Sequence, residues 1–165
     1  MRIALVEDDV ILAQNYSDLF AKADWKVSHY LDRASAFLGI EESTPDLAII
    51  DVGLGVEDEG GFQLCRQLRS NPETERLPII LMTARGEQDD KIYGLNLGAD
   101  EYCTKDHSMD YLVAVINSLI RRIEMDQQPP SVDRRKKSIG SLEIYPEEAR
   151  ATWRGEFVDI TPGEY

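Results

Sequence analysis

The stretch Asp46-Leu47-Ala48-Ile49-Ile50-Asp51 decides the fold of this chain. Its apolar run is too short for a helix and follows a Pro-Asp turn signal, so it is predicted to be a buried strand. The glycine-rich segment 52–55 cannot continue this strand beyond Asp51. In an open parallel sheet, ligands bind outside the carboxyl ends of the strands. Asp51 is therefore a candidate functional residue, although a helix cap or a turn aspartate explains it equally well in isolation.

Similar apolar segments alternate with helical patterns along residues 1–125. The other predicted strands are 3–6, 25–30, 78–82 and 100–104. Helical spacing of apolar residues predicts helices over 10–23, 34–40, 62–68, 88–97 and 108–125. Five alternations of strand and helix predict an α/β fold, with a doubly wound five-stranded parallel sheet and right-handed crossovers.

Polar side chains follow the predicted strands at one edge of this sheet. They are Glu7, Asp8, Asp51, Thr83 and Lys105. Asp9 lies beside them, but it is well placed to cap the helix that starts at residue 10. A single carboxylate at a strand end is weak evidence. Three acids, a hydroxyl and a lysine from separate strands make a functional site the better interpretation.

The chemistry of this set favours phosphoryl transfer. Clustered carboxylates repel one another unless a cation neutralises them, and their oxygens suit Mg²⁺. A lysine and a threonine on the other side of the site can hold phosphoryl oxygens. Asp51 is then either a metal ligand or a nucleophile that forms an acyl phosphate.

Composition limits the class of protein. With 42% hydrophobic and 30% charged residues the chain is globular, and its net charge of −13 argues against a broad nucleic-acid surface. The two cysteines, Cys65 and Cys103, are predicted to be small buried side chains in a reducing cytosol. No signal peptide or membrane-length apolar stretch is present in the sequence. We therefore expect a cytoplasmic protein that does not contact a membrane.

The last 40 residues differ from the rest. Residues 126–138 have linker composition with a basic run at 134–137, and short strands are predicted over 142–145, 149–153 and 157–160. Three short strands are too few for an independent core. Because helix-start chemistry follows at 161–164, we expect a longer natural protein that is cut short here.

Residues 1–125 resemble the receiver domain of two-component response regulators. The resemblance rests on the acid pair Glu7-Asp8, Asp51, Thr83-Ala84, Lys105 and the segment 94–102, which reads G-L-x-x-G-A-D-E-Y. Residues 139–165 resemble the opening of an OmpR/PhoB-type winged-helix domain. The resemblance implies a transcription regulator that binds promoter DNA through a domain largely missing here.

The resemblance also assigns roles to individual residues. Asp51 accepts a phosphoryl group from a sensor histidine kinase, and Thr83 and Lys105 contact the phosphoryl oxygens. Asp8, Asp51 and the Gly53 carbonyl bind Mg²⁺ directly, and Glu7 binds it through water. Tyr102 is the switch aromatic, with simple packing as the alternative.

Two departures from the family pattern lie beside the site, and a third concerns the dimer face. Gly55 replaces a proline, and the loop to Gly61 is longer and more acidic, with Val-Glu-Asp-Glu at 56–59. We expect this loop to be mobile and to slow anionic phosphodonors in a salt-dependent way. Lys105 precedes Asp106 instead of proline, so we expect a trans peptide bond. Gly53 cannot orient an attacking water and Arg85 lies near the site, which predicts slow hydrolysis of the acyl phosphate.

The resemblance further implies a twofold dimer through the 88–97 helix, the 100–104 strand and the 108–125 helix. Two of its usual ion pairs are missing, since Lys91 faces Tyr111 and Asp100 faces Val115. Exposed ion pairs contribute only ~0–1 kcal/mol each, so we expect a dimer that depends more on apolar contact. The predicted dimer residues are Lys91, Ile92, Leu95, Glu101, Tyr111, Ala114, Val115 and Arg122.

Two other functions are considered. A degenerate receiver would act as an interaction module that does not depend on phosphorylation. A Mg²⁺-dependent aspartyl-phosphate phosphohydrolase of the haloacid-dehalogenase type would need a second acid two residues after the nucleophile, where this chain has Gly53. We therefore predict a phosphoacceptor switch and not an enzyme.

Overall fold

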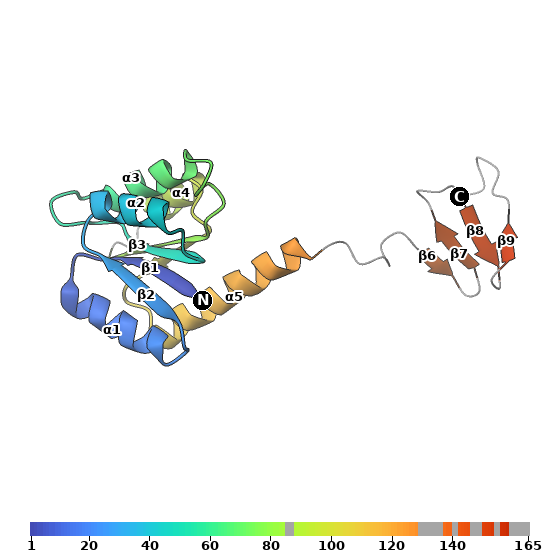
Figure 1. Ribbon diagram of the computed structural model, residues 1–165, viewed down its shortest axis with the longest axis horizontal. Helices are drawn as coiled ribbons and strands as arrows, with labels where there is room; N and C mark the ends of the chain where they lie inside the picture. The colour runs from blue at the N-terminus through green and yellow to red at the C-terminus, as the bar shows by residue number, and fades with distance from the viewer. Residues whose placement is uncertain (85–87, 129–136, 140–141, 146–149, 154–155, 159–165) are drawn as a thin grey trace. The chain divides into compact units, whose positions relative to one another are not determined.

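The computed structural model describes residues 1–84 and 88–128, and the backbone of four strands between residues 137 and 158 (Figure 1). Its internal contacts divide the chain into two units, Met1–Leu119 and Ile120–Tyr165. The first unit holds a five-stranded sheet and the second a four-stranded sheet. Each is described separately below.

The first sheet is entirely parallel, with the strand order β2-β1-β3-β4-β5. Its strands are β1 (Arg2–Val6), β2 (Lys26–Tyr30), β3 (Leu47–Asp51), β4 (Ile79–Thr83) and β5 (Glu101–Thr104). The helices between and after them are α1 (Val10–Ala21), α2 (Arg33–Glu42), α3 (Gly60–Arg69), α4 (Gln88–Asn96) and α5 (Met109–Gln127). Helices α2, α3 and α4 cover one face and α1 and α5 the other (Figure 1). The predicted doubly wound α/β fold is confirmed.

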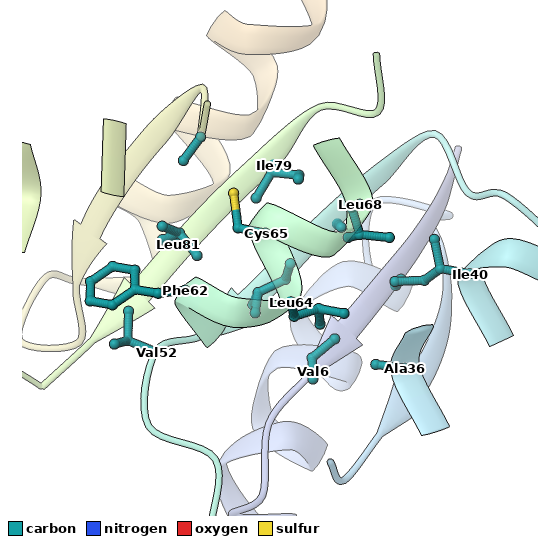
Figure 2. Packing of buried hydrophobic residues seen from close by; sticks show 14 of the residues in the cluster. Val6, Ala36, Ile40, Val52, Phe62, Leu64, Cys65, Leu68, Ile79 and Leu81 are labelled. Carbon is teal, nitrogen blue, oxygen red and sulfur yellow. The ribbon is translucent and has the colours of Figure 1, made fainter. Parts of the chain in front are cut away.

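Strand β3 lies in the core, with helices on both faces of the sheet. All five of its residues are buried, as the continuous apolar run predicted. On one face, Phe62, Leu64, Cys65 and Leu68 of α3 pack on the sheet (Figure 2). Burial of a large apolar side chain contributes about 1.5–3 kcal/mol, so this layer holds α3 firmly against the strand that carries Asp51.

Gly61 lets α3 begin directly beside the end of β3. A Cβ at this position would collide with the backbone carbonyl oxygen of Asp51 and lie 2.6 Å from Cα of Val52. The amide of Gly61 donates a hydrogen bond of 2.8 Å to the carbonyl of Val52. Only glycine fits this close approach, which fixes the backbone around the candidate functional residue.

The second sheet is an antiparallel meander, as predicted, but it has one more strand. Its order is β6 (Lys137–Ile139), β7 (Leu142–Tyr145), β8 (Arg150–Trp153) and β9 (Glu156–Val158). Strand β6 starts inside the basic run that was interpreted as linker. The basic run suggested a linker, but basic residues do not exclude a strand, since edge strands commonly carry lysine. The predicted helix start at 161–164 lies outside the described residues.

The structure also tests the predicted helix ends, the state of the cysteines and the 105–106 peptide bond. Helix α1 ends two residues before the predicted end at 23, and α5 continues two residues past 125. Both cysteines are buried and unpaired, as predicted. Within the described ranges the backbone has no cis peptide bond, so the 105–106 bond is trans. Among the same residues, no helix is long and apolar enough to cross a membrane.

Candidate functional site

Charged side chains from three strand ends meet at the carboxyl edge of the parallel sheet. Nζ of Lys105, just after β5, lies 2.7 Å from Oδ2 of Asp51 and 2.8 Å from Oε2 of Glu7. Asp51 ends β3, and Glu7 follows the neighbouring strand β1. The two acidic residues are only 6% and 2% exposed. One ammonium group thus contacts two buried carboxylates and can balance the charge of only one of them.

Asp8 adds a third carboxylate on the solvent side. It is exposed, and its Oδ2 accepts a hydrogen bond of 3.0 Å from the amide of Gly55. One oxygen from each of Glu7, Asp8 and Asp51 lies within 4.8 Å of the others. Three carboxylates against one lysine leave excess negative charge, and this all-oxygen donor set fits a hard divalent cation.

Burial shifts the proton equilibria of the site. It raises the pKa of Glu7 to about 7, with the hydrogen bond from Lys105 acting in the opposite direction. The pKa of Asp51 is also raised by burial, again against the effect of Lys105. For Lys105, burial alone would lower the pKa, but hydrogen bonds to Asp51 and Glu7 hold it above its usual value. The positive charge of Lys105 is therefore too small to offset the effect of burial on both Glu7 and Asp51.

The backbone around Glu7 is fixed from two sides. Its Oε1 accepts a hydrogen bond of 3.1 Å from the amide of Asp9. Asp9 itself caps α1 as predicted, since Oδ1 accepts from the amides of Ile11 and Leu12 at 3.0 Å each. The carbonyl of Glu7 lies 2.7 Å from Nε2 of His29, which must donate because a carbonyl can only accept. His29 thus has a structural contact that sequence spacing did not reveal.

The other predicted site residues lie near this cluster or face inward. Thr83 ends β4 and is 2% exposed, and its carbonyl accepts a hydrogen bond of 2.7 Å from the amide of Lys105. Tyr102 of β5 is 7% exposed and lies under α4. Gly94 of α4 makes room for it, since a Cβ there would be 3.1 Å from Cδ2 of Tyr102. Gly53 is exposed in the loop after β3.

The loop after β3 is tied to its surroundings more closely than expected. Leu54 and Glu57 pair through backbone hydrogen bonds of 2.9 and 3.0 Å, with Gly55 at a φ of 60° between them. The Glu57 carboxylate forms an ion pair of 2.7 Å with Arg33 of α2. Arg33 was not predicted as a partner of this loop, and its positive charge offsets part of the loop's predicted acidity. Arg85 lies outside the described residues.

The predicted dimer face carries a groove and exposed apolar side chains. Ile92 and Leu95 of α4 are 50% and 39% exposed, and Tyr111 of α5 is 45% exposed. Ala114 is exposed beside them, and Val115 is half-buried. The groove is lined by Gln88, Lys91, Ile92, Leu95, Tyr102, Thr104, His107 and Tyr111.

Asp100 has no predicted cationic partner on α5. It forms an ion pair with Arg69 of the same chain. Nη2 of Arg69 lies 3.1 Å from its Oδ2, which also accepts a hydrogen bond of 2.9 Å from the amide of Ile79. The same guanidinium donates to the carbonyls of Gly98 and Leu77, at 2.8 and 2.6 Å. Arg69 therefore joins the end of α3 to the starts of β4 and β5.

Comparison with protein families identifies this arrangement. The family model described as the response regulator receiver domain matches residues 3–117. The chain belongs to this family. The resemblance drawn from the strand-end residues is thereby confirmed for the receiver domain.

The curated relatives of this receiver domain are transcriptional regulators. The chain is 36% identical over 165 residues to the phosphate regulon transcriptional regulatory protein PhoB of Rhizobium meliloti, covering 99% of this chain and 69% of that protein. It is 30% identical over 164 residues to the transcriptional regulatory protein BaeR of Escherichia coli O6:H1, covering 99% and 65%. The chain thus spans about two thirds of the length of these relatives.

Solved structures agree with the fold. The BeF3-activated N-terminal receiver domain of RstA from Klebsiella pneumoniae matches with a TM-score of 0.67 at 28% identity, over 73% of this chain and 99% of that chain. The receiver domain of the Francisella response regulator 1452 matches with the same TM-score at 27% identity, over 74% and 98%.

Proposed function

We propose that this chain is a phosphorylation switch in which Asp51 accepts a phosphoryl group from a sensor histidine kinase in the cytoplasm. The observation that carries the proposal is the contact of one lysine with two buried carboxylates beside a third, exposed carboxylate. A cluster built only for stability would pair each buried charge. Here three carboxylates face one lysine, so an additional cation is needed to balance the charge.

In the proposed transfer, a carboxylate oxygen of Asp51 attacks phosphorus while the bond from phosphorus to the kinase histidine nitrogen breaks. A proton on the other ring nitrogen of the phosphohistidine lets the imidazole leave as a neutral group, and the product on this chain is an acyl phosphate on Asp51. Lys105 holds Oδ2 of Asp51 at 2.7 Å, which orients the nucleophile and leaves its other oxygen for the attack. Thr83 and Lys105 then hold phosphoryl oxygens, and Tyr102 responds to the new position of Thr83.

Mg²⁺ is the cation that we assign to the carboxylates. Asp8, Asp51 and the Gly53 carbonyl would bind it directly, and Glu7 would bind it through water. Glu7 suits the outer position because it is 2% exposed and its oxygens already bond to Lys105 and to the amide of Asp9. When bound, the ion supplies positive charge to the phosphoryl oxygens during transfer.

The output of the switch is proposed to be transcription. Residues 1–125 would form the receiver domain, 126–138 the linker, and 139–165 the first strands of a winged-helix domain that reads promoter DNA in a longer protein. Support comes from the antiparallel sheet β6 to β9 and from relatives that are named as transcriptional regulators along 99% of this chain.

A single experiment tests the switch. Acetyl phosphate with Mg²⁺ should add one phosphoryl group to the wild type, measured by intact mass, and none to Asp51→Asn. Asp58→Asn removes an exposed acid from the neighbouring loop and should leave the modification intact. Failure of the wild type to react would favour the degenerate receiver that works without phosphorylation.

Dimerisation is tested separately. With beryllofluoride and Mg²⁺, the wild type should sediment as a dimer, and Ile92→Ala should weaken it. Leu38→Ala is the matched control, because Leu38 is 65% exposed on α2, on another part of the surface. A dimer that is weakened by the control and not by Ile92→Ala would contradict the assignment of this face.

A further inference from the structure

Arg33, the first residue of α2, contacts the loop that follows Asp51. Its Nε lies 2.7 Å from Oε2 of Glu57 and its Nη2 lies 3.2 Å from Oε1, which is a two-point contact. Its Nη1 donates to Oε1 of Gln67 on α3 at 3.3 Å. The guanidinium has a rigid planar geometry, so this contact fixes the direction of the Glu57 side chain.

Glu57 transmits this restraint to the loop backbone. Its amide and carbonyl pair with those of Leu54, at 3.0 and 2.9 Å, and its carbonyl also accepts a hydrogen bond of 3.1 Å from Gly60. These bonds close a turn whose tip is Gly55 and Val56. The tip has no side-chain support of its own, because Val56 is fully exposed.

The turn directs one backbone amide at the candidate metal site. Gly55 has a φ of 60°, and in this conformation its amide donates to Oδ2 of Asp8 at 3.0 Å. A side chain is disfavoured at such a φ, so the glycine suits this position. A carboxylate has two oxygens, and holding one of them leaves the other oriented for a cation.

We propose that Arg33 is a positioning residue for the metal site, acting through Glu57 and the Gly55 amide on Asp8. The inference rests on the proposed function, since it assumes that Asp8 binds a divalent cation. It gives the inserted acids of the loop a specific role, because Glu57 holds the loop in place while Asp58 and Glu59 remain exposed.

The test uses two variants that change the net charge in opposite directions. Arg33→Met removes a positive charge and Glu57→Gln removes a negative one. If both weaken binding of Mg²⁺ alone, by about tenfold, which is the lower end of the effect of outer-shell changes, positioning is the cause. Long-range electrostatics predicts instead that Arg33→Met binds Mg²⁺ more tightly, and that result would overturn the proposal.

Matched controls isolate the contact. Arg76→Met and Asp58→Asn make the same charge changes at exposed residues outside this set of contacts, and should change Mg²⁺ affinity by less than about twofold. The swapped pair Arg33→Glu with Glu57→Arg should restore part of the affinity. Controls as damaging as the two variants would also overturn the proposal.

A readout without metal separates this proposal from the proposed function. In metal-free protein, the amide proton of Gly55 should exchange faster and shift upfield in Arg33→Met and Glu57→Gln, because its hydrogen bond to Asp8 weakens. An unchanged Gly55 amide overturns the role of Arg33 even if Mg²⁺ binds. A changed amide in a protein that does not bind Mg²⁺ overturns the proposed metal site and leaves the contact standing.

Discussion

Two charged clusters lie at opposite ends of β5, and they are built on different principles. At the start of the strand, Arg69 donates to two carbonyls and to Asp100, so each arm of its guanidinium has an acceptor. At the end of the strand, Lys105 is shared between Glu7 and Asp51, and Asp8 adds a further negative charge. The first cluster is complete within the chain, whereas the second needs more positive charge.

The difference teaches how charge can be used for stability or for function. A satisfied hydrogen-bond network holds secondary-structure elements together, and its loss leaves carbonyls without donors. An under-neutralised group of acids costs free energy in the empty state, but binds a cation for the same reason, and the bound cation can in turn attract phosphoryl oxygens. The comparison predicts that changes in the two clusters affect stability and function in opposite ways.

The largest effect is expected for Asp51→Asn. It should abolish phosphoryl incorporation, and it should also raise the free energy of unfolding by about 1 kcal/mol, because it removes a buried negative charge beside Glu7. Urea denaturation without Mg²⁺ measures the second effect. A variant that is clearly less stable than the wild type would show that Asp51 serves the fold as Asp100 does.

Arg69→Met should have the reverse profile. It leaves the Gly98 and Leu77 carbonyls without this donor and removes a partly exposed ion pair, so it should lower the free energy of unfolding by about 1–3 kcal/mol. Phosphorylation by acetyl phosphate should continue at the wild-type rate below the unfolding transition. Arg66→Met is the control, since the Arg66 guanidinium donates to the hydroxyl of Tyr93 in an exposed contact of 3.0 Å. Equal losses in both variants would contradict the special role of Arg69.

The pH dependence of stability should come from the functional cluster. Folded Glu7 keeps its proton up to about pH 7, whereas the unfolded chain releases it near 4.5, so the folded state binds more protons in between. Without Mg²⁺, the free energy of unfolding should therefore fall as pH rises through this window, on the order of 2 kcal/mol. Asp51 and Lys105 face the same carboxyl group. Glu7→Gln should flatten the curve, and an unchanged slope would assign the effect elsewhere.

Mg²⁺ should increase the free energy of unfolding by binding to the carboxylate cluster, and the Arg69 cluster should not contribute to this effect. At tenfold excess over its dissociation constant, a cation that binds only the folded state adds ~1.4 kcal/mol. The wild type and Arg69→Met should gain this amount equally in thermal or urea unfolding. A gain that persists in Asp8→Asn with Asp51→Asn would place the bound cation at another site.

Much of the site followed from sequence order alone. A short apolar run such as Ala48-Ile49-Ile50, bounded by turn signals, favours a strand with apolar layers on both faces, and parallel strands bring their carboxyl ends to the same edge. Glu7, Asp51 and Lys105 were therefore predicted as neighbours before any distance was known. The helical cap at Asp9 was equally predictable, because it depends on residues three positions apart at most.

The contacts that only the tertiary structure decided are those between side chains and distant backbone. Arg33 lies 24 residues from Glu57, and Arg69 lies 31 residues from Asp100. A cation has many possible acid partners in a sequence, and the helix packing selects one. The sequence by itself determined the order of strands and helices and the set of residues at the sheet edge. Which charges are satisfied, and which are left for a ligand, was decided by the folded geometry.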